Sequence, residues 1–492
     1  MDRRQFLRRF AGEAPAPPPS PPPVSSGLEP YTGPWDEPQA AHLIRRALFG
    51  LTRADLVDAL FRSPAGAVDH LVDTAVARPL PAAPSWYNTA GTNIAWRYEW
   101  QEAWYAEMRA GGLKERMTLL WHDHFVTAID VYGHAAFAYQ YLTKLRTHAL
   151  GNFRTLLHAV GTLPAMLIYL DGEDSSAGNI NENYARELLE LFSMGRVGPD
   201  GQDNYTQQDI VEAARALTGW VVNMSTLRGE FDPSRHDGGA KTIFGRTGTW
   251  DYDDVHDILF DEREEEIASW VAQKIYSWFV HPVPNPEVVA GMAQTLRQND
   301  FEVAPVVRQL LKSAHFYEEA FVGSRIKSPC EYLVGLTREL GIVPPQALLG
   351  RFRETGYNLG QDLLNPPTVA GWPGYAPDEY RAWITTGSVP ERRAEATNAL
   401  EGNGAFPSFD PLPLVEALSD ATSAAAIARD LAAHLLPAPL DDDDLTELEA
   451  ILLDGAPWWE WVTLYQSNPE AARQRVRLLL DHLVNLPEYQ LT

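Results

Sequence analysis

Apolar residues recur at three- and four-residue intervals along most of the chain, which is the spacing of amphipathic α-helices. Thr52, Ser63 and Thr206 stand before such runs at positions suited to cap a first helical turn. We predict helices over eight central segments and over several more after residue 410. The eight are 93–110, 113–129, 134–149, 152–170, 264–280, 285–299, 303–320 and 328–340. The pattern therefore predicts a mainly α protein, built as a large multi-helix globular array.

Two stretches of the chain lack the helical period. Residues 221–256 are rich in Gly, Asp, Arg and Thr, and we predict a long irregular loop there with at most a small β-hairpin. Residues 358–377 are interrupted by prolines and glycines and are predicted to be irregular as well. Long loops inside compact domains are often functional. The acidic run 441–444 is predicted to be a solvated linker or a helix start.

The N-terminal residues DRRQFLRRF resemble a twin-arginine export motif. A signal peptide also needs an apolar stretch of roughly 7–15 residues, but the residues that follow carry Glu13 and a cluster of prolines. We therefore predict a twin-arginine-like start and a proline-rich disordered spacer over 1–29, a main helical body over 30–390 and a C-terminal helical part over 391–492. The predicted location is the cytoplasm. The alternative is the periplasm, reached by twin-arginine export or together with an exported partner.

The charge balance narrows the classes of partner. The 492 residues include 66 Asp and Glu against 40 Lys and Arg, which gives a net charge of −26. Such an acidic chain repels phosphate backbones, so nucleic acid is not an expected partner. The sequence has no run of 18 or more apolar residues, and we expect no membrane span. Cys330, the single cysteine, excludes an internal disulfide and is predicted to be a buried thiol.

The segment NENYARELLELFSMG has a polar first half and an apolar second half. On a helix that begins near Glu182, the residues Asn183, Arg186, Glu187 and Glu190 share one face with Glu182. Glu182, Arg186 and Glu190 would form an i, i+4 ladder worth about a few tenths of a kcal/mol per pair when exposed. Spacing alone favours a solvated charged face, and a working surface is the alternative.

The segment WHDHF places two histidines two residues apart. On a helix these side chains point about 200° away from each other, so His122 and His124 cannot share one metal ion. We predict that His124 points inward, either as a core histidine with one hydrogen-bond partner or as part of a site, and that His122 points away. The sequence contains no zinc-protease, di-iron, nucleophile-elbow, phosphate-loop or dinucleotide-binding motif.

The glycine-rich segment RHDGGAKTIFG carries three side chains suited to chemistry. Lys241 could bind an anion or a carbonyl group, with His236 and Asp237 as an acid/base pair. The alternative is an ordered surface loop that is held by hydrogen bonds from its own side chains.

Several of these segments occur in the order found in a large bacterial family, and the chain resembles that family over about residues 38–492. The motifs that carry the resemblance are HLIRRALFGLT, NENYARELLELFSMG, YTQQDIVEAARALTGW, HDGGAKTIFG, RIKSPCEYLVGLTREL, LGQDLLNPPTVAGWPG and LPEYQL. The family is known as domain of unknown function 1800. The resemblance implies a mainly helical fold. It also implies a partner, because members are often encoded beside proteins of domain of unknown function 1501, which are similar to alkaline phosphatases and sulfatases.

Three hypotheses follow from the residues and the resemblance together. The first is a helical binding or accessory protein for a phosphatase- or sulfatase-like partner, with seven binding residues. These are Asn183, Arg186, Trp220, Lys241, Lys327, Gln361 and Trp372. The second is a hydrolase with a carboxylate/histidine site, dependent on a hard metal such as Mg²⁺ or Ca²⁺. Its catalytic residues would be Glu182, Glu187, His236 and Asp237.

The third hypothesis is structural. It joins Glu182, Arg186, Glu187 and Lys241 in a buried ion-pair network that fixes the packing of helices. None of the three hypotheses identifies a cofactor.

Overall fold

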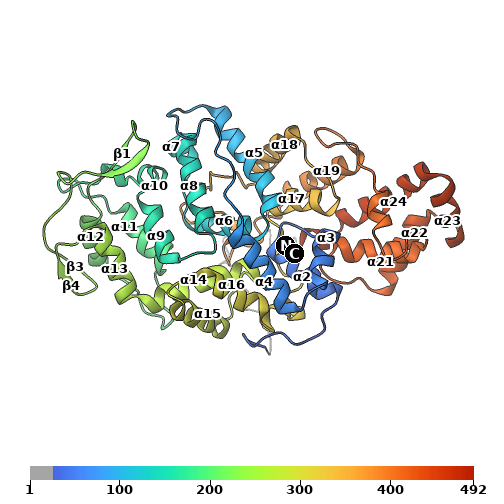
Figure 1. The fold of residues 1–492 in the computed structure, drawn as a ribbon, viewed down its shortest axis with the longest axis horizontal. Helices are drawn as coiled ribbons and strands as arrows, with labels where there is room; N and C mark the ends of the chain where they lie inside the picture. Colours follow the sequence, from blue (N-terminus) through green and yellow to red (C-terminus); the bar gives the residue numbers. More distant parts are fainter. Residues whose placement is uncertain (1–25) are drawn as a thin grey trace, which may run out of the picture.

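Helices dominate the computed structural model, which describes residues 26–492 (Figure 1). The α-helices are α2 Glu37–Ala47, α3 Arg53–Leu60, α4 Pro64–Ala77, α5 Ile94–Gly111, α6 Leu113–His124, α7 Ile129–Tyr132, α8 Ala135–Thr147, α9 Phe153–Gly161, α10 Pro164–Tyr169, α11 Asn183–Glu187, α12 Gln207–Ala216, α13 Tyr252–Glu262, α14 Glu264–Phe279, α15 Pro286–Gln298, α16 Val303–Lys312, α17 Pro329–Glu339, α18 Gln346–Asn358, α19 Ser388–Glu401, α20 Leu412–Glu416, α21 Ala424–Leu435, α22 Asp442–Leu453, α23 Trp458–Ser467 and α24 Pro469–Asn485. Short 3₁₀ helices are η1 Gly172–Asp174, η3 His315–Tyr317, η4 Glu319–Phe321, η5 Pro373–Tyr375 and η6 Pro487–Gln490, and η2 Leu188–Ser193 is a π-helix. The mainly α class is confirmed.

Side chains at the predicted N-cap positions accept backbone N–H groups of the first helical turn, as expected. Thr52 accepts the backbone N–H of Asp55 at 3.1 Å, and Thr206 accepts that of Asp209 at 3.2 Å. Each contact satisfies a backbone donor that has no partner inside the helix. Pro164 begins α10 and thereby divides one predicted helix in two, because proline fits the first turn of a helix but not its interior.

The β-strands of the described residues form two hairpins. Strand β1 Trp220–Asn223 pairs antiparallel with β2 Arg228–Phe231, and β3 Lys241–Ile243 pairs antiparallel with β4 Arg246–Gly248. Both hairpins lie in the segment where the sequence predicts at most one. They flank the loop that carries His236, so this loop is anchored at both of its ends.

The helices form an elongated body with distinct ends (Figure 1). The hairpins and α9–α13 lie at one end, and α21–α24 lie at the other. The chain then returns to the body, where Thr492 and Arg325 exchange backbone hydrogen bonds of 2.8 and 3.3 Å. The predicted boundary between 390 and 391 falls inside α19, and the division into domains stays a prediction. The predicted spacer over 1–29 lies outside the described residues except for its last four positions.

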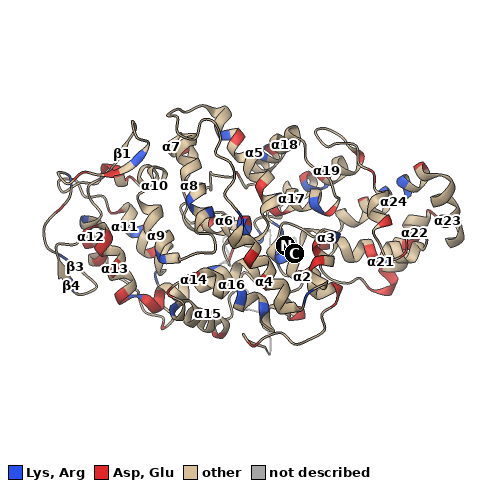
Figure 2. Ribbon diagram, viewed as in Figure 1, with Lys and Arg blue, Asp and Glu red and all other residues tan. Residues whose placement is uncertain are grey.

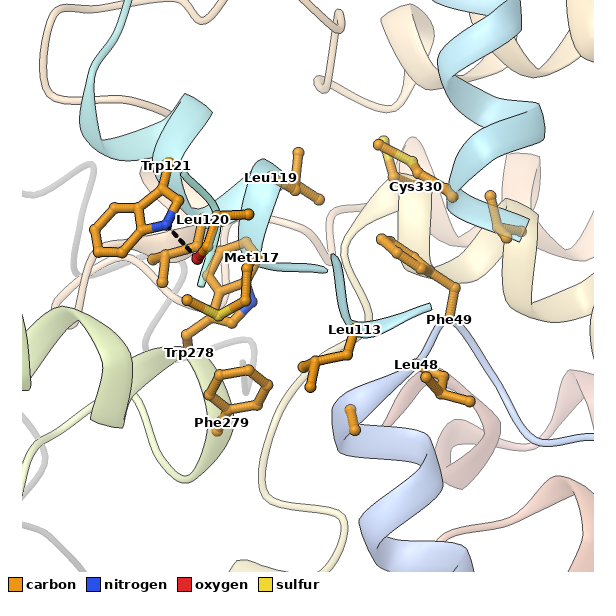
Figure 3. Packing of buried hydrophobic residues seen from close by; sticks show 14 of the residues in the cluster. Leu48, Phe49, Leu113, Met117, Leu119, Leu120, Trp121, Trp278, Phe279 and Cys330 are labelled. Atoms are coloured by element: carbon orange, nitrogen blue, oxygen red, sulfur yellow. Dashed lines mark hydrogen bonds between the residues drawn. The ribbon is translucent and has the colours of Figure 1, made fainter. Parts of the chain in front are cut away.

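Helix α6 runs through the centre of the core. Every residue of α6 except Asp123 is buried. Figure 3 shows Met117 of this helix against Trp278, and Cys330 beside Phe49. Cys330 is buried as predicted, and this burial raises the pKa of its thiol.

Charged residues of α6 are buried together with their partners. Arg116 pairs with Glu331 of α17, and Arg146 donates to Glu115 at 2.8 Å. Burial alone would raise the pKa of Glu331, but the guanidinium groups of Arg116 and Arg325 outweigh it and lower that pKa to about 2. These pairs connect α6 to its neighbours at the cost of desolvating each charge.

Acidic and basic side chains are interspersed along the helices (Figure 2). Within residues 26–492, no helix combines the length and the apolar character that crossing a bilayer requires.

Candidate functional site

The segment NENYARELLELFSMG forms the short helix α11, which widens at once into the π-helix η2. Donors from other helices hold the carbonyl groups of η2: His124 Nε2 donates to Phe192 O at 2.9 Å, and Trp270 Nε1 donates to Leu191 O at 2.8 Å. Ser193 Oγ donates to Leu188 O at 2.6 Å within the same turn. Such π-turns are rare and are frequent at functional sites.

The polar side chains of this segment lie on an accessible face. Arg186 is 3.1 Å from Glu182, and both side chains are 39% exposed. Gln207 of α12 donates to Glu182 at 2.8 Å, so the pair is also tied to a second helix. Glu190 does not extend the ladder but accepts the hydroxyl of Tyr205 at 2.9 Å. The widening at η2 explains this, because Glu190 no longer stands one α-turn beyond Arg186.

Glu187 differs from its neighbours on the same face. Its side chain is half-buried and makes no hydrogen bond or ion pair with any of residues 26–492. Burial raises the pKa of this carboxyl, nearby Glu190 adds to the effect, and Arg186 opposes it. Asn183 is exposed, and its amide donates to Asp171 at 3.4 Å. We call Glu182, Asn183, Arg186, Glu187 and Glu190 the α11 polar face.

Side chains of the His236–Lys241 loop mainly hold the loop itself. Arg215 Nε donates to Asp237 at 2.7 Å, and this contact is the main reason that the pKa of Asp237 is lowered. Lys241 is buried and donates from Nζ to three backbone carbonyl groups, including Gly239 at 3.1 Å and Trp250 at 2.9 Å. Lys241 makes the contacts that the ordered-loop alternative describes, and Asp237 accepts the backbone N–H of Gly239 at 2.8 Å in addition to its contact with α12. Their roles in a site stay predictions.

His236 is partly exposed, whereas Lys241 of the same loop is buried. Its Nδ1–H donates to the backbone carbonyl of Thr218 at 3.0 Å. The Nε2 atom has no hydrogen-bond partner among the described residues and remains available. The hypothesis of a buried network that includes Lys241 is wrong, because Glu182 and Arg186 are partly exposed and Lys241 is committed to its own loop.

Helix α11 and strand β1 meet at a small cavity of about 10 Å³, which is about the minimum that one water molecule needs. Its walls include Asn181, Tyr184, Trp220 and Tyr252. The indole Nε1 of Trp220 is buried without a hydrogen-bond partner in the described part of the chain. None of the four predicted catalytic residues lines this cavity.

The predicted catalytic residues are also not assembled as metal ligands. Among residues 26–492, no group of three or more His, Cys, Asp or Glu side chains is placed to hold a metal ion. Glu182, Glu187, His236 and Asp237 therefore do not share an ion-binding arrangement in this structure, and their individual catalytic roles stay predictions.

The three remaining predicted binding residues are buried. Lys327 Nζ lies 3.5 Å from Glu339 and 3.9 Å from the ring centre of Tyr489. Gln361 accepts the backbone N–H of Cys330 at 2.9 Å, at the start of α17. These contacts connect segments of the C-terminal half of the body and place all three residues in its interior.

Trp372, the third of these residues, leads to the WHDHF segment. Its backbone N–H donates to Asp123 at 2.9 Å. The two histidines that flank Asp123 also make long-range contacts. His122 accepts the backbone N–H of Leu364 at 3.1 Å, and His124 donates to Phe192 O of η2. The prediction of an inward-pointing His124 with one partner is confirmed. His122 is buried as well, because residues 358–377 cover the side of α6 that was expected to face away.

Asp123 borders a polar pocket of about 40 Å³, enough for a few water molecules. Lys274, Ser277, Arg325 and Tyr380 are among the residues on its walls. Burial raises the pKa of Asp123 to about 7, against smaller opposite effects of the Trp372 N–H and Lys274. Burial likewise lowers the pKa of Lys274, and Asp123 opposes this. A carboxyl that titrates near neutrality can give or take a proton at physiological pH.

The comparison with known families agrees with the motifs described above. The sequence profile of a family described as protein of unknown function (DUF1800) matches residues 42–491. The chain belongs to the DUF1800 family. It has no match among curated proteins and none among solved structures.

In this DUF1800 protein the predicted residues divide into two groups. The α11 polar face and His236 remain accessible, whereas Lys241, Lys327, Gln361 and Trp372 stabilise the scaffold. Sequence reasoning missed Asp123 and Lys274. The available signal was the acidic residue between the two histidines of WHDHF, since it stands on a helix that is otherwise buried.

Proposed function

We propose that this DUF1800 protein is a helical binding or accessory protein whose α11 polar face docks a phosphatase- or sulfatase-like protein of domain of unknown function 1501. The observation that supports it most directly is the state of Glu187. This half-buried carboxylate has no hydrogen-bond partner among residues 26–492, although Glu182, Arg186 and Glu190 beside it each have one. A partly desolvated charge without a partner is costly, and a cationic or N–H group from a docking protein would offset that cost.

The surroundings of Glu187 are suited to recognition. Glu182 and Arg186 are held by Gln207, and Glu190 is held by Tyr205, so the face loses little side-chain entropy when it is covered. Charges at the rim of an interface steer association and select the partner more than they add affinity. The self-held loop with His236 and the helices beneath it provide a rigid support.

A capture experiment tests this proposal. The tagged protein is mixed with a phosphatase-like protein of domain of unknown function 1501, and the amount retained is measured for wild type and for Arg186→Gln combined with Glu187→Gln. The matched control is Arg429→Gln with Glu447→Gln, which removes the same charges from exposed positions on α21 and α22. We expect retention by wild type and control and at least a tenfold loss for the first variant. If wild type retains no phosphatase-like protein, the proposal fails.

The pocket at Asp123 favours a second candidate function, a hydrolase. One oxygen of Asp123 is fixed by Trp372, and the carboxyl borders a pocket that admits water, so it could serve as a general base with Lys274 nearby. Hydrolysis of p-nitrophenyl acetate and p-nitrophenyl phosphate would be compared for wild type, Asp123→Asn and the exposed control Asp378→Asn. A general base contributes about 10²–10⁴-fold, so Asp123→Asn alone should lower the rate by that factor. If wild type hydrolyses neither ester, this candidate is eliminated.

A further inference from the structure

A larger pocket is lined by residues of α5, α7 and α18 and by Asp362, and it shares no lining residue with the pocket at Asp123 or with the α11 polar face. Figure 1 shows where these helices lie. The pocket volume of about 260 Å³ compares with about 40 Å³ at Asp123 and approaches the lower end of the range of small-molecule sites, about 300 Å³. Its walls are Arg97, Tyr98, Gln101, Asp130, Arg353, Glu354, Tyr357, Asn358 and Asp362. The pocket thus combines aromatic rings with planar polar groups.

Two tyrosines give the pocket its aromatic surface. Tyr98 of α5 is 37% exposed, and Tyr357, near the end of α18, is 66% exposed. The guanidinium group of Arg353 lies 3.8 Å from the ring centre of Tyr98, which holds that ring in place. No cation of residues 26–492 lies over the ring of Tyr357, so this ring is offered to a ligand. Small-molecule pockets are commonly lined by aromatic side chains together with a few placed polar groups.

The polar groups of the pocket are fixed by one another. Arg97 pairs with Asp130 and lies 3.0 Å from Asp362. Gln101 donates to Asp362 at 2.8 Å, and Asn365 donates to Asp130 at 2.7 Å. These carboxylates therefore keep one orientation, while the Asp130 side chain remains 60% exposed. Preorganised planar groups pair well with ligands that carry neighbouring hydrogen-bond donors and acceptors.

The charge of the pocket selects among classes of ligand. Arg97 and Arg353 are both already paired with carboxylates, and Asp130, Asp362 and Glu354 leave a net negative charge on the walls. An anionic ligand such as a phosphate would be repelled by these walls. A lipid chain would find too few apolar contacts. A neutral molecule that is rich in hydroxyl groups meets neither obstacle.

We propose that the pocket between α5 and α18 binds a neutral saccharide. The C–H face of a sugar ring would pack on Tyr357, and neighbouring hydroxyl groups would donate to the exposed carboxylate of Asp130 and accept from the exposed amide of Asn358. The site is separate from the α11 polar face, so saccharide binding does not depend on the partner proposed above. It would allow one protein to hold a carbohydrate and a docked enzyme at the same time.

Titration with three neutral oligosaccharides tests the proposal. Cellohexaose, maltohexaose and chitohexaose are each added to the full chain, and binding is followed by calorimetry and saturation-transfer NMR. We expect at least one of them to bind wild type, and Tyr357→Ala to weaken that binding about tenfold or more, as is usual for an aromatic hot spot. The control is Phe61→Ala, which removes another exposed ring, 88% accessible, at the end of α3.

Both substitutions remove exposed rings, so both variants should remain folded, and thermal unfolding verifies this. Binding that is lost in Tyr357→Ala but kept in Phe61→Ala supports the proposal. Three outcomes overturn it: no binding of any of the three oligosaccharides, unchanged binding by Tyr357→Ala, or displacement of the bound sugar by inorganic phosphate.

Discussion

The backbone N–H of Trp372 donates a 2.9 Å hydrogen bond to Oδ1 of Asp123, although the two residues are 249 positions apart in the chain. The residue before Trp372 makes this contact possible. Gly371 has φ +94, and a Cβ atom there would lie 2.3 Å from Oδ1 of Asp123 and 2.8 Å from its backbone oxygen. The glycine of the GWPG motif is therefore explained by the close approach of this loop to α6, whereas Trp372 contributes only its backbone N–H to the contact.

Gly371→Ala should destabilise the protein more than an ordinary glycine substitution. Left-handed backbone conformation costs a side-chain-bearing residue about 1–3 kcal/mol, and the contact with Asp123 adds a steric clash. Gly360→Ala is the matched control, since Gly360 has φ +89 but no atom within 4 Å of the added Cβ. Urea unfolding measures both variants. Equal losses of unfolding free energy would mean that the loop moves away from α6 without cost.

Asp123→Asn should alter the pH dependence of stability. The pKa of Asp123 is raised from 3.8 to about 7 in the folded protein. Below about pH 4 the carboxyl is protonated in both the folded and the unfolded protein. Between about pH 4 and 7 it ionises in the unfolded protein but stays protonated in the folded one. Wild type should therefore lose stability relative to Asp123→Asn as pH rises through this window, by about 1.4 kcal/mol per unit of pKa difference.

Unfolding in denaturant at a series of pH values measures this difference. Asparagine keeps the oxygen that accepts from Trp372, so the comparison isolates the ionisation. A constant difference between the two proteins from pH 4 to 7 would contradict the raised pKa of Asp123.

Lys241→Met should loosen the loop that contains His236. The substitution keeps the aliphatic stem but leaves three backbone carbonyl groups without their donor, at about 1–3 kcal/mol for each buried group that remains unsatisfied. Hydrogen exchange should become faster over residues 235–250. Lys144→Met, at a half-buried position on α8, is the control and should leave exchange in that loop unchanged. Unaltered protection in Lys241→Met would show that the hairpins alone hold the loop.

Arg116→Met should cost about 3–5 kcal/mol, because it leaves the buried carboxylate of Glu331 without its main partner. Adding Glu331→Gln removes the unpaired charge. The glutamine keeps an oxygen that can accept the backbone N–H of Ser328, which donates to Glu331 at 2.7 Å in the wild type. The double variant should therefore be more stable than Arg116→Met alone. A double-mutant cycle from urea unfolding measures the coupling, and additive losses would argue against a direct pair.

Local features of the fold could be predicted from the sequence, and long-range ones could not. The caps at Thr52 and Thr206 involve residues three positions away, so their chemistry is visible in the sequence. The π-turn at η2 is held by His124 and Trp270, which are 68 and 79 residues from the carbonyl groups that they bind. No periodicity within NENYARELLELFSMG indicates that widening.

The candidate site shows the same limit. The α11 polar face could be predicted, and its Glu182–Arg186 pair is present at the expected spacing. The hydrogen bonds of Lys241 and Gln361 to backbone groups could not be predicted. A motif shows which residue type is needed, but not whether its side chain faces a ligand or the scaffold. Asp123 could not be predicted either, because one of its oxygens is fixed by Trp372, which is distant in the sequence.

Because residues 358–377 complete the cover of α6 and are made much later than this helix, the order of synthesis has a consequence for the folding of this protein. The backbone groups that donate to His122 and Asp123 lie 242 and 249 residues further along the chain. At translation rates of about 5–20 residues per second, that interval is about 12–50 s. For that time the side of α6 that carries His122 and Asp123 is without its final cover on the nascent chain, where it is exposed to aggregation or available to chaperones.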